Sequence, residues 1–263
     1  MPRLLTGTVI GLTWLGLLLF APPLIFWLAI SLISLLALRE YSRMVLTGGG
    51  EKRLRLLLMV TGLLPVLSVG CRQSYLLPAS LVIALTIFLL VTIFRYSTLE
   101  KPLFFLLSSA FATLYLGLLP AHIPMLMALD NGREWLIIAT LITVSADSGA
   151  FYVGTNFGRH KLCPGLSPGK TVEGLAGGVL CALVVVGLSV HLFFPSINLL
   201  QSLFFAFILS LAAVAGDLTE SLIKRGTGVK DSGGLLPGHG GILDRMDSLL
   251  LVVPLLYYLL LAL

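Results

Sequence analysis

Long apolar runs alternate with short polar segments along the whole chain. A helix needs about 20 apolar residues to cross about 30 Å of hydrocarbon, because each residue adds about 1.5 Å. The pattern predicts about nine transmembrane helices, at residues 4–20, 22–38, 56–70, 76–94, 103–128, 135–154, 173–194, 202–223 and 243–262. The runs are continuous and rich in leucine, which favours helices over alternating strands. The predicted fold class is an all-α polytopic membrane protein.

The composition supports this class and argues against a soluble domain, a cysteine-based site and a nucleic-acid partner. The 263 residues are 57% hydrophobic and 11% charged, and the mean hydropathy is +1.04. Such a chain is too apolar for an ordinary soluble domain. Cys71, Cys163 and Cys181 have no CxxC spacing, so the sequence indicates neither a zinc site nor a redox site. The net charge of +5 comes from basic residues clustered between the apolar runs, and we expect no nucleic-acid partner.

The basic residues also predict an orientation. With nine spans and a cytoplasmic N-terminus, 15 of the 17 Lys and Arg residues face the cytoplasm, leaving Arg72 and Arg133 outside. An alternative with eight spans fuses the first hairpin and moves the N-terminus outside, but it keeps the last basic loop cytoplasmic. We expect an integral multi-pass protein of the plasma or inner membrane, if the source is bacterial, with its polar loops facing the cytoplasm.

We predict two regions along the chain. Residues 1–130 form N-terminal transmembrane helices, about five spans, and residues 131–263 form a C-terminal catalytic transmembrane region with polar loops at 155–171 and 224–246. These cytoplasmic loops would form the active site. Prolines are expected to kink two of the helices, the fifth at Pro120 and Pro124 and the ninth at Pro254.

Acidic residues flank the second loop with helical spacing. Asp217, Glu220 and Lys224 fall within an arc of about 60° on one helix, and Asp244 and Asp247 share a face of the next. An ionised group inside a membrane costs about 2.5–3.5 kcal/mol on insertion scales, so several carboxylates together need a cation. A divalent metal is one such cation. Pairing with the basic residues Lys224 and Arg225 is the alternative.

The first loop is rich in glycine and basic residues. Arg159, Lys161 and Lys170 flank the stretch SPGKT, and we expect a helix to begin near Thr171 or Val172. Free N–H groups and the dipole at a helix N-terminus favour an anion there. The stretch lacks the full GxxxxGK[ST] pattern of a P-loop, so we do not expect a Walker-type ATPase.

The second loop carries a longer motif. Residues 221–247 read SxxKRxxxxKDxGxxLPGHGGxxDRxD, which fixes more than a dozen positions over 27 residues. This motif resembles the signature of the phosphatidate cytidylyltransferases, also called CDP-diglyceride synthases. Residues 146–174, ADSGAFYVGTNFGRHKLCPGLSPGKTVEG, look like the other polar block of that family. The resemblance covers the C-terminal half well and the N-terminal half only by hydropathy.

The resemblance implies transfer of a cytidylyl group from CTP to phosphatidic acid, which gives CDP-diacylglycerol and pyrophosphate with Mg²⁺ as cofactor. Membrane lipids would be further partners. The implied metal ligands are Asp217, Asp244 and Asp247, while Asp147 and Glu220 would orient those ligands or hold a second cation. The implied catalytic residues are Lys224, His239, Arg245 and Asp231. The implied substrate-binding residues are Ser167, Lys170, Lys230, Arg159 and Lys161.

Two other functions are compatible with acidic residues in a membrane. A transporter or channel would use them as an ion path, although such a path favours acids spread through the depth of the bilayer. The CDP-alcohol phosphotransferases use the pattern DGxxAR followed by GxxxDxxxD, which this chain does not contain. The sequence does not determine the oligomeric state, and a homodimer stays an open alternative.

Overall fold

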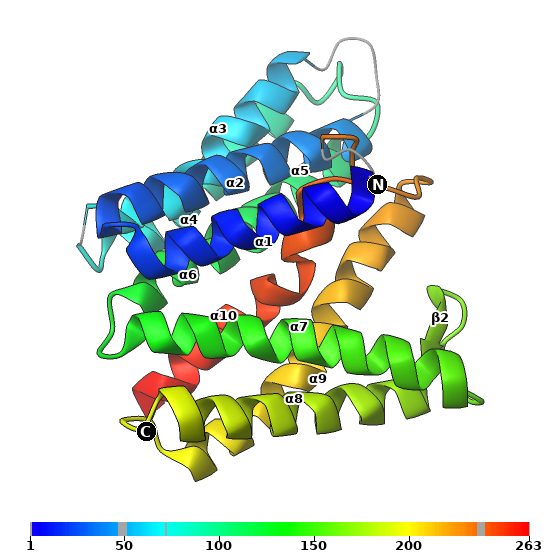
Figure 1. Ribbon diagram of the computed structural model, residues 1–263. Helices are drawn as coiled ribbons and strands as arrows, with labels where there is room; N and C mark the ends of the chain where they lie inside the picture. The colour runs from blue at the N-terminus through cyan, green and yellow to red at the C-terminus, as the bar shows by residue number, and fades with distance from the viewer. Residues whose placement is uncertain (1, 47–51, 72, 236–239, 263) are drawn as a thin grey trace. The chain divides into compact units, whose positions relative to one another are not determined.

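The computed structural model describes residues 2–46, 52–71, 73–235 and 240–262, and it describes side chains from residue 5 onward (Figure 1). The described chain is almost entirely helical. Its helices are α1 (Pro2–Phe20), α2 (Pro23–Val45), α3 (Lys52–Val69), α4 (Leu76–Phe94), α5 (Pro102–Ala112), the π-helix η1 (Thr113–Leu118), α6 (Leu119–Met127), α7 (Gly132–Phe157), α8 (Val172–Phe193), α9 (Leu199–Gly226) and α10 (Leu243–Ala262). Two short strands, β1 (Lys161–Cys163) and β2 (Ser167–Thr171), lie between α7 and α8.

Helices lie at all of the predicted positions, and most of them can cross a membrane. Seven segments of the described chain are long and apolar enough to do so: α2, α4, the run Pro102–Met127, α7, α8, α9 and α10. The apolar part of α1 is shorter, Leu5–Phe20. Helix α3 carries Lys52, Arg53 and Arg55 in its first turn. The protein is therefore an integral membrane protein, while the count of nine spans stays a prediction.

The chain forms two compact units. The first contains Met1–Ala128 and Val229–Asp244, and the second contains Leu129–Gly228 and Arg245–Leu263. Most of the second polar loop therefore packs with the N-terminal helices. The catalytic role that the sequence assigns to residues 131–263 stays a prediction.

In the first unit, a polar contact compensates for a proline in the fifth predicted span. Pro120 has no N–H group to donate to the carbonyl of Leu116, four residues earlier. The π-helical turn η1 ends at Leu118, two residues before this proline, and the hydroxyl of Ser34 on α2 donates to the Leu116 carbonyl. A Cβ at Gly117 would overlap the carbonyl oxygen of Gly62, so η1 packs directly on the backbone of α3. The interruption of the helix is thus stabilised by its two neighbours.

In the second unit, small residues bring α7 and α8 together. The two helices lie side by side along most of their length (Figure 1). A Cβ added at Gly174 would lie 2.8 Å from the carbonyl oxygen of Ala150, and one at Gly178 would lie 2.6 Å from that of Ala146. This close approach is typical of transmembrane helices whose interface is built from small residues. The backbones of α7 and α8 are therefore in contact.

The first polar loop contains a β-hairpin that the all-α expectation did not include. Helix α7 continues to Phe157, and β1 pairs with β2 in antiparallel orientation. Leu166 donates its N–H group to the carbonyl of Cys163 at 3.1 Å, which closes the turn. Helix α8 begins at Val172, as the sequence predicts, and the hydroxyl of Thr171 accepts from the N–H of Gly174 at 3.1 Å. The hairpin thus leads directly into a capped helix.

We expect Gly178→Ala to destabilise the protein by about 1–3 kcal/mol, because the added methyl group has no space beside the Ala146 carbonyl. Thermal unfolding in detergent measures the change. Gly187→Ala in the same helix is the control, since its added Cβ would lie 3.4 Å from a methyl group of Leu203, which is an ordinary van der Waals contact. Equal unfolding temperatures for the two variants would contradict the proposed packing.

Candidate functional site

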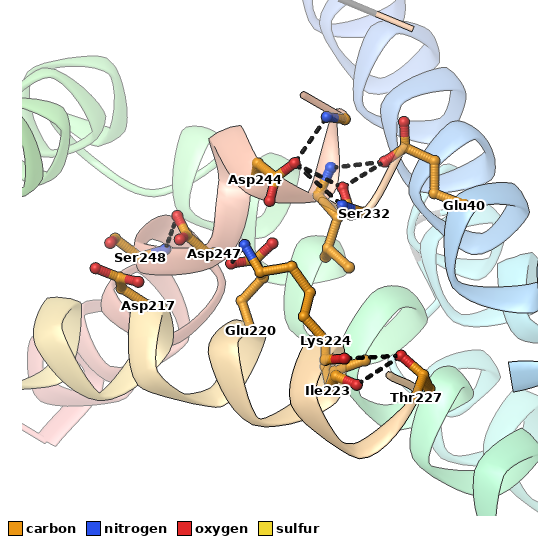
Figure 2. Close-up of polar contacts among 12 residues, drawn as sticks. Glu40, Asp217, Glu220, Ile223, Lys224, Thr227, Ser232, Asp244, Asp247 and Ser248 are labelled. Atoms are coloured by element: carbon orange, nitrogen blue, oxygen red, sulfur yellow. Dashed lines mark hydrogen bonds and ion pairs between the residues drawn. The ribbon is translucent and has the colours of Figure 1, made fainter. Parts of the chain in front are cut away.

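Three carboxylates come together on α9 and α10 in the second unit. Asp217 and Glu220 lie three residues apart on α9, and Asp247 lies on α10 (Figure 2). One oxygen atom from each of these side chains lies within 4.8 Å of the others. We call these three residues the carboxylate cluster. Two of them, Asp217 and Asp247, are metal ligands implied by the sequence motif.

A glycine allows α9 and α10 to approach at this point. A Cβ at Gly216 would overlap the carbonyl oxygen of Asp247 and would lie 3.0 Å from the Cα of Ser248. Because position 216 has no side chain, α9 contacts the backbone of α10 in the turn that carries Asp247. The N–H group of Ser248 donates to Oδ1 of Asp247 at 2.7 Å. The position of the Asp247 carboxylate is therefore set by backbone contacts.

Two lysines neutralise part of the cluster. Nζ of Lys170, at the end of the hairpin, lies 2.6 Å from Oδ2 of Asp217, and Nζ of Lys224 lies 2.7 Å from Oε2 of Glu220. The Glu220 side chain is 2% exposed, so its charge depends on such a partner. The pairing of Lys224 is the alternative that the sequence left open. In the part of the chain that the structure describes, these three carboxylates form two lysine ion pairs, so their negative charge is only partly neutralised.

The chemistry of the cluster suits a hard divalent cation. Carboxylate oxygens are the ligands that Mg²⁺ takes in proteins, and one or two carboxylates are enough when substrate phosphates and water complete its shell. The donor set differs from the one implied by the motif, because Glu220 is a member of the cluster. Asp244 makes other contacts: its Oδ2 accepts from the N–H of Gly241 at 2.7 Å and from the hydroxyl of Ser232 at 2.9 Å. The role of Asp244 as a metal ligand stays a prediction.

Two further predicted residues of the second unit lie near these charges. Asp147 on α7 is within electrostatic range of Asp217, Lys170 and Arg245. Arg245 is exposed in the first turn of α10. The structure thus brings the proposed orienting residue and one proposed catalytic residue into the electrostatic environment of the cluster.

The hairpin connects the predicted substrate-binding residues to this environment. Ser167 and Lys170 lie on β2, Lys161 is exposed on β1, and Arg159 is exposed just before it. Among the described residues of the hairpin, Lys170 forms an ion pair with the cluster. The other three lie in the same short segment, and their contacts with a substrate stay predictions.

Glu173 holds the start of the hairpin and was not singled out from the sequence. Its carboxylate accepts from the backbone N–H groups of Arg159, at 3.0 Å, and His160, at 3.2 Å. It also lies 2.6 Å from Nδ1 of His160. An acidic residue in the first turn of a helix was a usable signal, because negative charge is favoured at a helix N-terminus.

The remaining predicted residues lie in the second polar loop. Lys230 and Asp231 are exposed. His239 lies outside the described residues. The backbone of this loop also donates a hydrogen bond to Glu40 of α2. Glu40 is a buried acid that was not among the site residues predicted from the sequence. No local pattern marks Glu40, since its partners come from the other end of the chain.

Comparisons with known proteins agree with the motif. A sequence model of the cytidylyltransferase family matches residues 1–263. The chain is 43% identical over 183 residues to a phosphatidate cytidylyltransferase of Bacillus subtilis (strain 168), covering 67% of each chain. It is 42% identical over 170 residues to a protein of the same name from Staphylococcus haemolyticus, covering 63% of this chain and 64% of the relative. It is 41% identical over 168 residues to one from Staphylococcus saprophyticus, with the same coverage of 63% and 64%. The chain thus spans about two thirds of the length of these relatives.

We expect Gly216→Ala to lower the stability by about 1–3 kcal/mol and to abolish thermal stabilisation by Mg²⁺, because the methyl group pushes α10 away from α9. The measurement is thermal unfolding in detergent with and without Mg²⁺. Gly226→Ala at the end of α9 is the control, since no described atom beyond its own stretch of helix backbone lies within 4 Å of its added Cβ. A Gly216→Ala protein that Mg²⁺ still stabilises like the wild type would refute the link between this glycine and the cluster.

Proposed function

This chain belongs to the cytidylyltransferase family, and on that premise we propose that it transfers the cytidylyl group of CTP to the phosphate of phosphatidic acid. The products are CDP-diacylglycerol and pyrophosphate. The observation that carries the proposal is the carboxylate cluster, because it lies within a chain whose relatives are named phosphatidate cytidylyltransferase. Such a reaction brings two strongly anionic substrates together at a membrane surface.

The reaction needs alignment and charge neutralisation more than it needs a base. An oxygen of the phosphatidic acid phosphate attacks the α-phosphorus of CTP and forms a new phosphoanhydride bond. The bond between the α-phosphorus and its bridging oxygen to the β-phosphate breaks, and pyrophosphate leaves with the electron pair. Because the attacking phosphate is already ionised at neutral pH, no side chain has to remove a strongly held proton. The protein's contribution is therefore to position the two phosphates and stabilise the developing charge.

Asp217 and Asp247 are the residues that we assign to Mg²⁺ first, because the motif and the geometry both select them. We also assign Glu220 to Mg²⁺, because it belongs to the carboxylate cluster. Asp244 is assigned to Mg²⁺ because the family motif implies it. Mg²⁺, when bound, neutralises phosphate oxygens and the leaving pyrophosphate. Asp147 is assigned an orienting role or a second cation.

The basic residues supply the fixed positive charge that anionic substrates require. Lys170 and Lys224 already pair with the cluster, so each holds an ammonium group where a phosphate can share it. Lys230 and Arg245 are exposed. We assign these two residues to contacts with the phosphates of CTP or of the lipid. Arg159, Lys161 and Ser167 of the hairpin segment complete the nucleotide-binding surface. Asp231 and His239 keep the catalytic roles implied by the motif.

We further propose that the site faces the cytoplasm and that the protein spans the membrane nine times. The distribution of Lys and Arg supports this orientation. CTP would then arrive from the cytoplasm, and phosphatidic acid would enter laterally from the inner leaflet. The relatives named above are enzymes and lend no support to transport by the acidic residues.

Purified protein should convert labelled CTP into a chloroform-soluble product when phosphatidic acid and Mg²⁺ are present. Asp217→Asn and Asp247→Asn should each lower this activity about a hundredfold or more, because each removes a charge from the cluster. Asp130→Asn, at an exposed position in the turn before α7, is the matched control. Absence of product from the wild type would refute the function, and full activity of both cluster variants would refute the metal assignment.

The orientation predicts the reactivity of two introduced cysteines in a background where Cys71, Cys163 and Cys181 are serine. Ser196→Cys, exposed between α8 and α9, should react with an impermeant maleimide in intact cells. Gly234→Cys, which is exposed and has open space at its Cβ, should react only after the membrane is permeabilised. The reverse pattern would place the site outside the cytoplasm.

A further inference from the structure

Glu40 has a buried carboxylate whose hydrogen-bond partners lie about 200 residues later in the sequence. Glu40 lies on α2 and is 4% exposed. Its oxygens accept hydrogen bonds from the backbone N–H groups of Ile242, at 3.0 Å, and Leu243, at 3.1 Å. The hydroxyl of Ser232 lies 3.2 Å from its Oε2 (Figure 2). All of these residues belong to the first unit.

These contacts hold the beginning of α10. The first N–H groups of a helix have no partner within the helix, and here two N–H groups at the start of α10 donate to Glu40. A carboxylate is also the favoured charge at a helix N-terminus. An ionised side chain is costly to bury, so the carboxylate of Glu40 depends on these N–H donors for its stability in the interior. The first turn of α10 and the buried carboxylate of Glu40 therefore stabilise each other.

The second polar loop is shaped around the Glu40 side chain. A Cβ at Gly233 would lie 2.7 Å from Oε1 of Glu40, and one at Gly241 would overlap Oε2. Two glycines of the motif thus provide the space in which this carboxylate lies. The described parts of the loop thus approach Glu40 at two positions, Gly233 and Gly241.

The contacts continue to a residue of the proposed site. The hydroxyl of Ser232 lies 3.2 Å from Glu40 and 2.9 Å from Oδ2 of Asp244, and the same Oδ2 accepts from the N–H of Gly241. A hydroxyl has one proton to donate, so the Ser232 hydroxyl serves one of these two carboxylates at a time, while the N–H group of Ser232 lies 3.4 Å from Oδ2 of Asp244. Ser232 therefore links Glu40 to Asp244 through its two donors. A change at Glu40 would be transmitted to the Asp244 carboxylate through Ser232.

We propose that Glu40 is a positioning residue of the enzyme. It touches neither substrate, and it acts by fixing the loop and the first turn of α10 so that Lys230, Asp231 and Asp244 meet the substrates. This role rests on the proposed function, while the contacts that produce it do not. The N-terminal helices thereby contribute to a site whose recognisable motif lies about 200 residues away, since Glu40 and Ile242 are 202 positions apart.

Two measurements on Glu40→Gln in the full-length protein test the proposal. Glutamine keeps the shape but replaces one acceptor oxygen with an NH₂ group, which would meet a backbone N–H group. Hydrogen–deuterium exchange of residues 240–244 should become about tenfold faster, while exchange in α4 of the same unit stays unchanged. In mixed micelles, kcat/KM should fall about tenfold or more, with a KM for at least one substrate raised about threefold or more.

Two further variants keep the test decisive. Glu100→Gln, at an exposed position of the same unit, should behave like the wild type in both measurements. Ser232→Ala removes one of the two donors of Ser232 and should cause a smaller loss, and adding it to Glu40→Gln should lower activity by less than the product of the two separate effects.

Distinct results would overturn the proposal. A loss of activity with unchanged KM values and faster exchange throughout the chain would mean that Glu40 only stabilises the fold. Wild-type kinetics or unchanged exchange at residues 240–244 in Glu40→Gln would mean that it does not hold the loop. If the wild-type protein made no CDP-diacylglycerol, the proposed function would fail, and the exchange measurement would still decide whether Glu40 anchors α10.

Discussion

Three carboxylates within 4.8 Å of one another, in a protein built of apolar helices, set the main physical constraint on this molecule. Like charges repel strongly where water is scarce, so each acid needs a cation or several hydrogen-bond donors. Lys170 and Lys224 provide two cations, and they come from different elements: the hairpin before α8 and the last turn of α9. The remaining negative charge is what makes the cluster a suitable place for Mg²⁺ and for reactions of phosphates.

Glycines decide where this cluster can exist. At Gly216 the backbone of α10 contacts α9, and at Gly174 and Gly178 the backbone of α7 contacts α8. Helices that pack through small residues gain close van der Waals contact, which is the main source of helix association in a bilayer. The same contacts place charged residues of neighbouring helices at defined positions. Packing and chemistry in the second unit therefore depend on the same few positions.

The protein stabilises its buried and half-buried acids in two different ways. The cluster is partly neutralised by lysines, whereas Glu40 and Asp244 are stabilised by N–H groups and by the hydroxyl of Ser232. A carboxylate surrounded by backbone donors fixes the conformation of a loop, and it leaves the basic residues of that loop free to meet a substrate. The second arrangement thus complements the first: we propose that Glu40 anchors the loop and that the cluster provides the charge for the reaction.

The sequence by itself determined the helical membrane class, the positions of the helices and the family, because length, apolar composition and a long motif are local properties. The family motif also singled out Asp217 and Asp247 as metal ligands, and helical spacing placed Glu220 on the same face of its helix as Asp217. Only the tertiary structure decided that Glu220 joins them while Asp244 binds Ser232, and that the first loop forms a hairpin ending in Lys170 beside Asp217. Glu40 could not be selected from its neighbours in sequence, because the groups that explain its burial lie at the opposite end of the chain. Local pattern determines which face of a helix a residue occupies, but the partner of a buried charge depends on which helices meet.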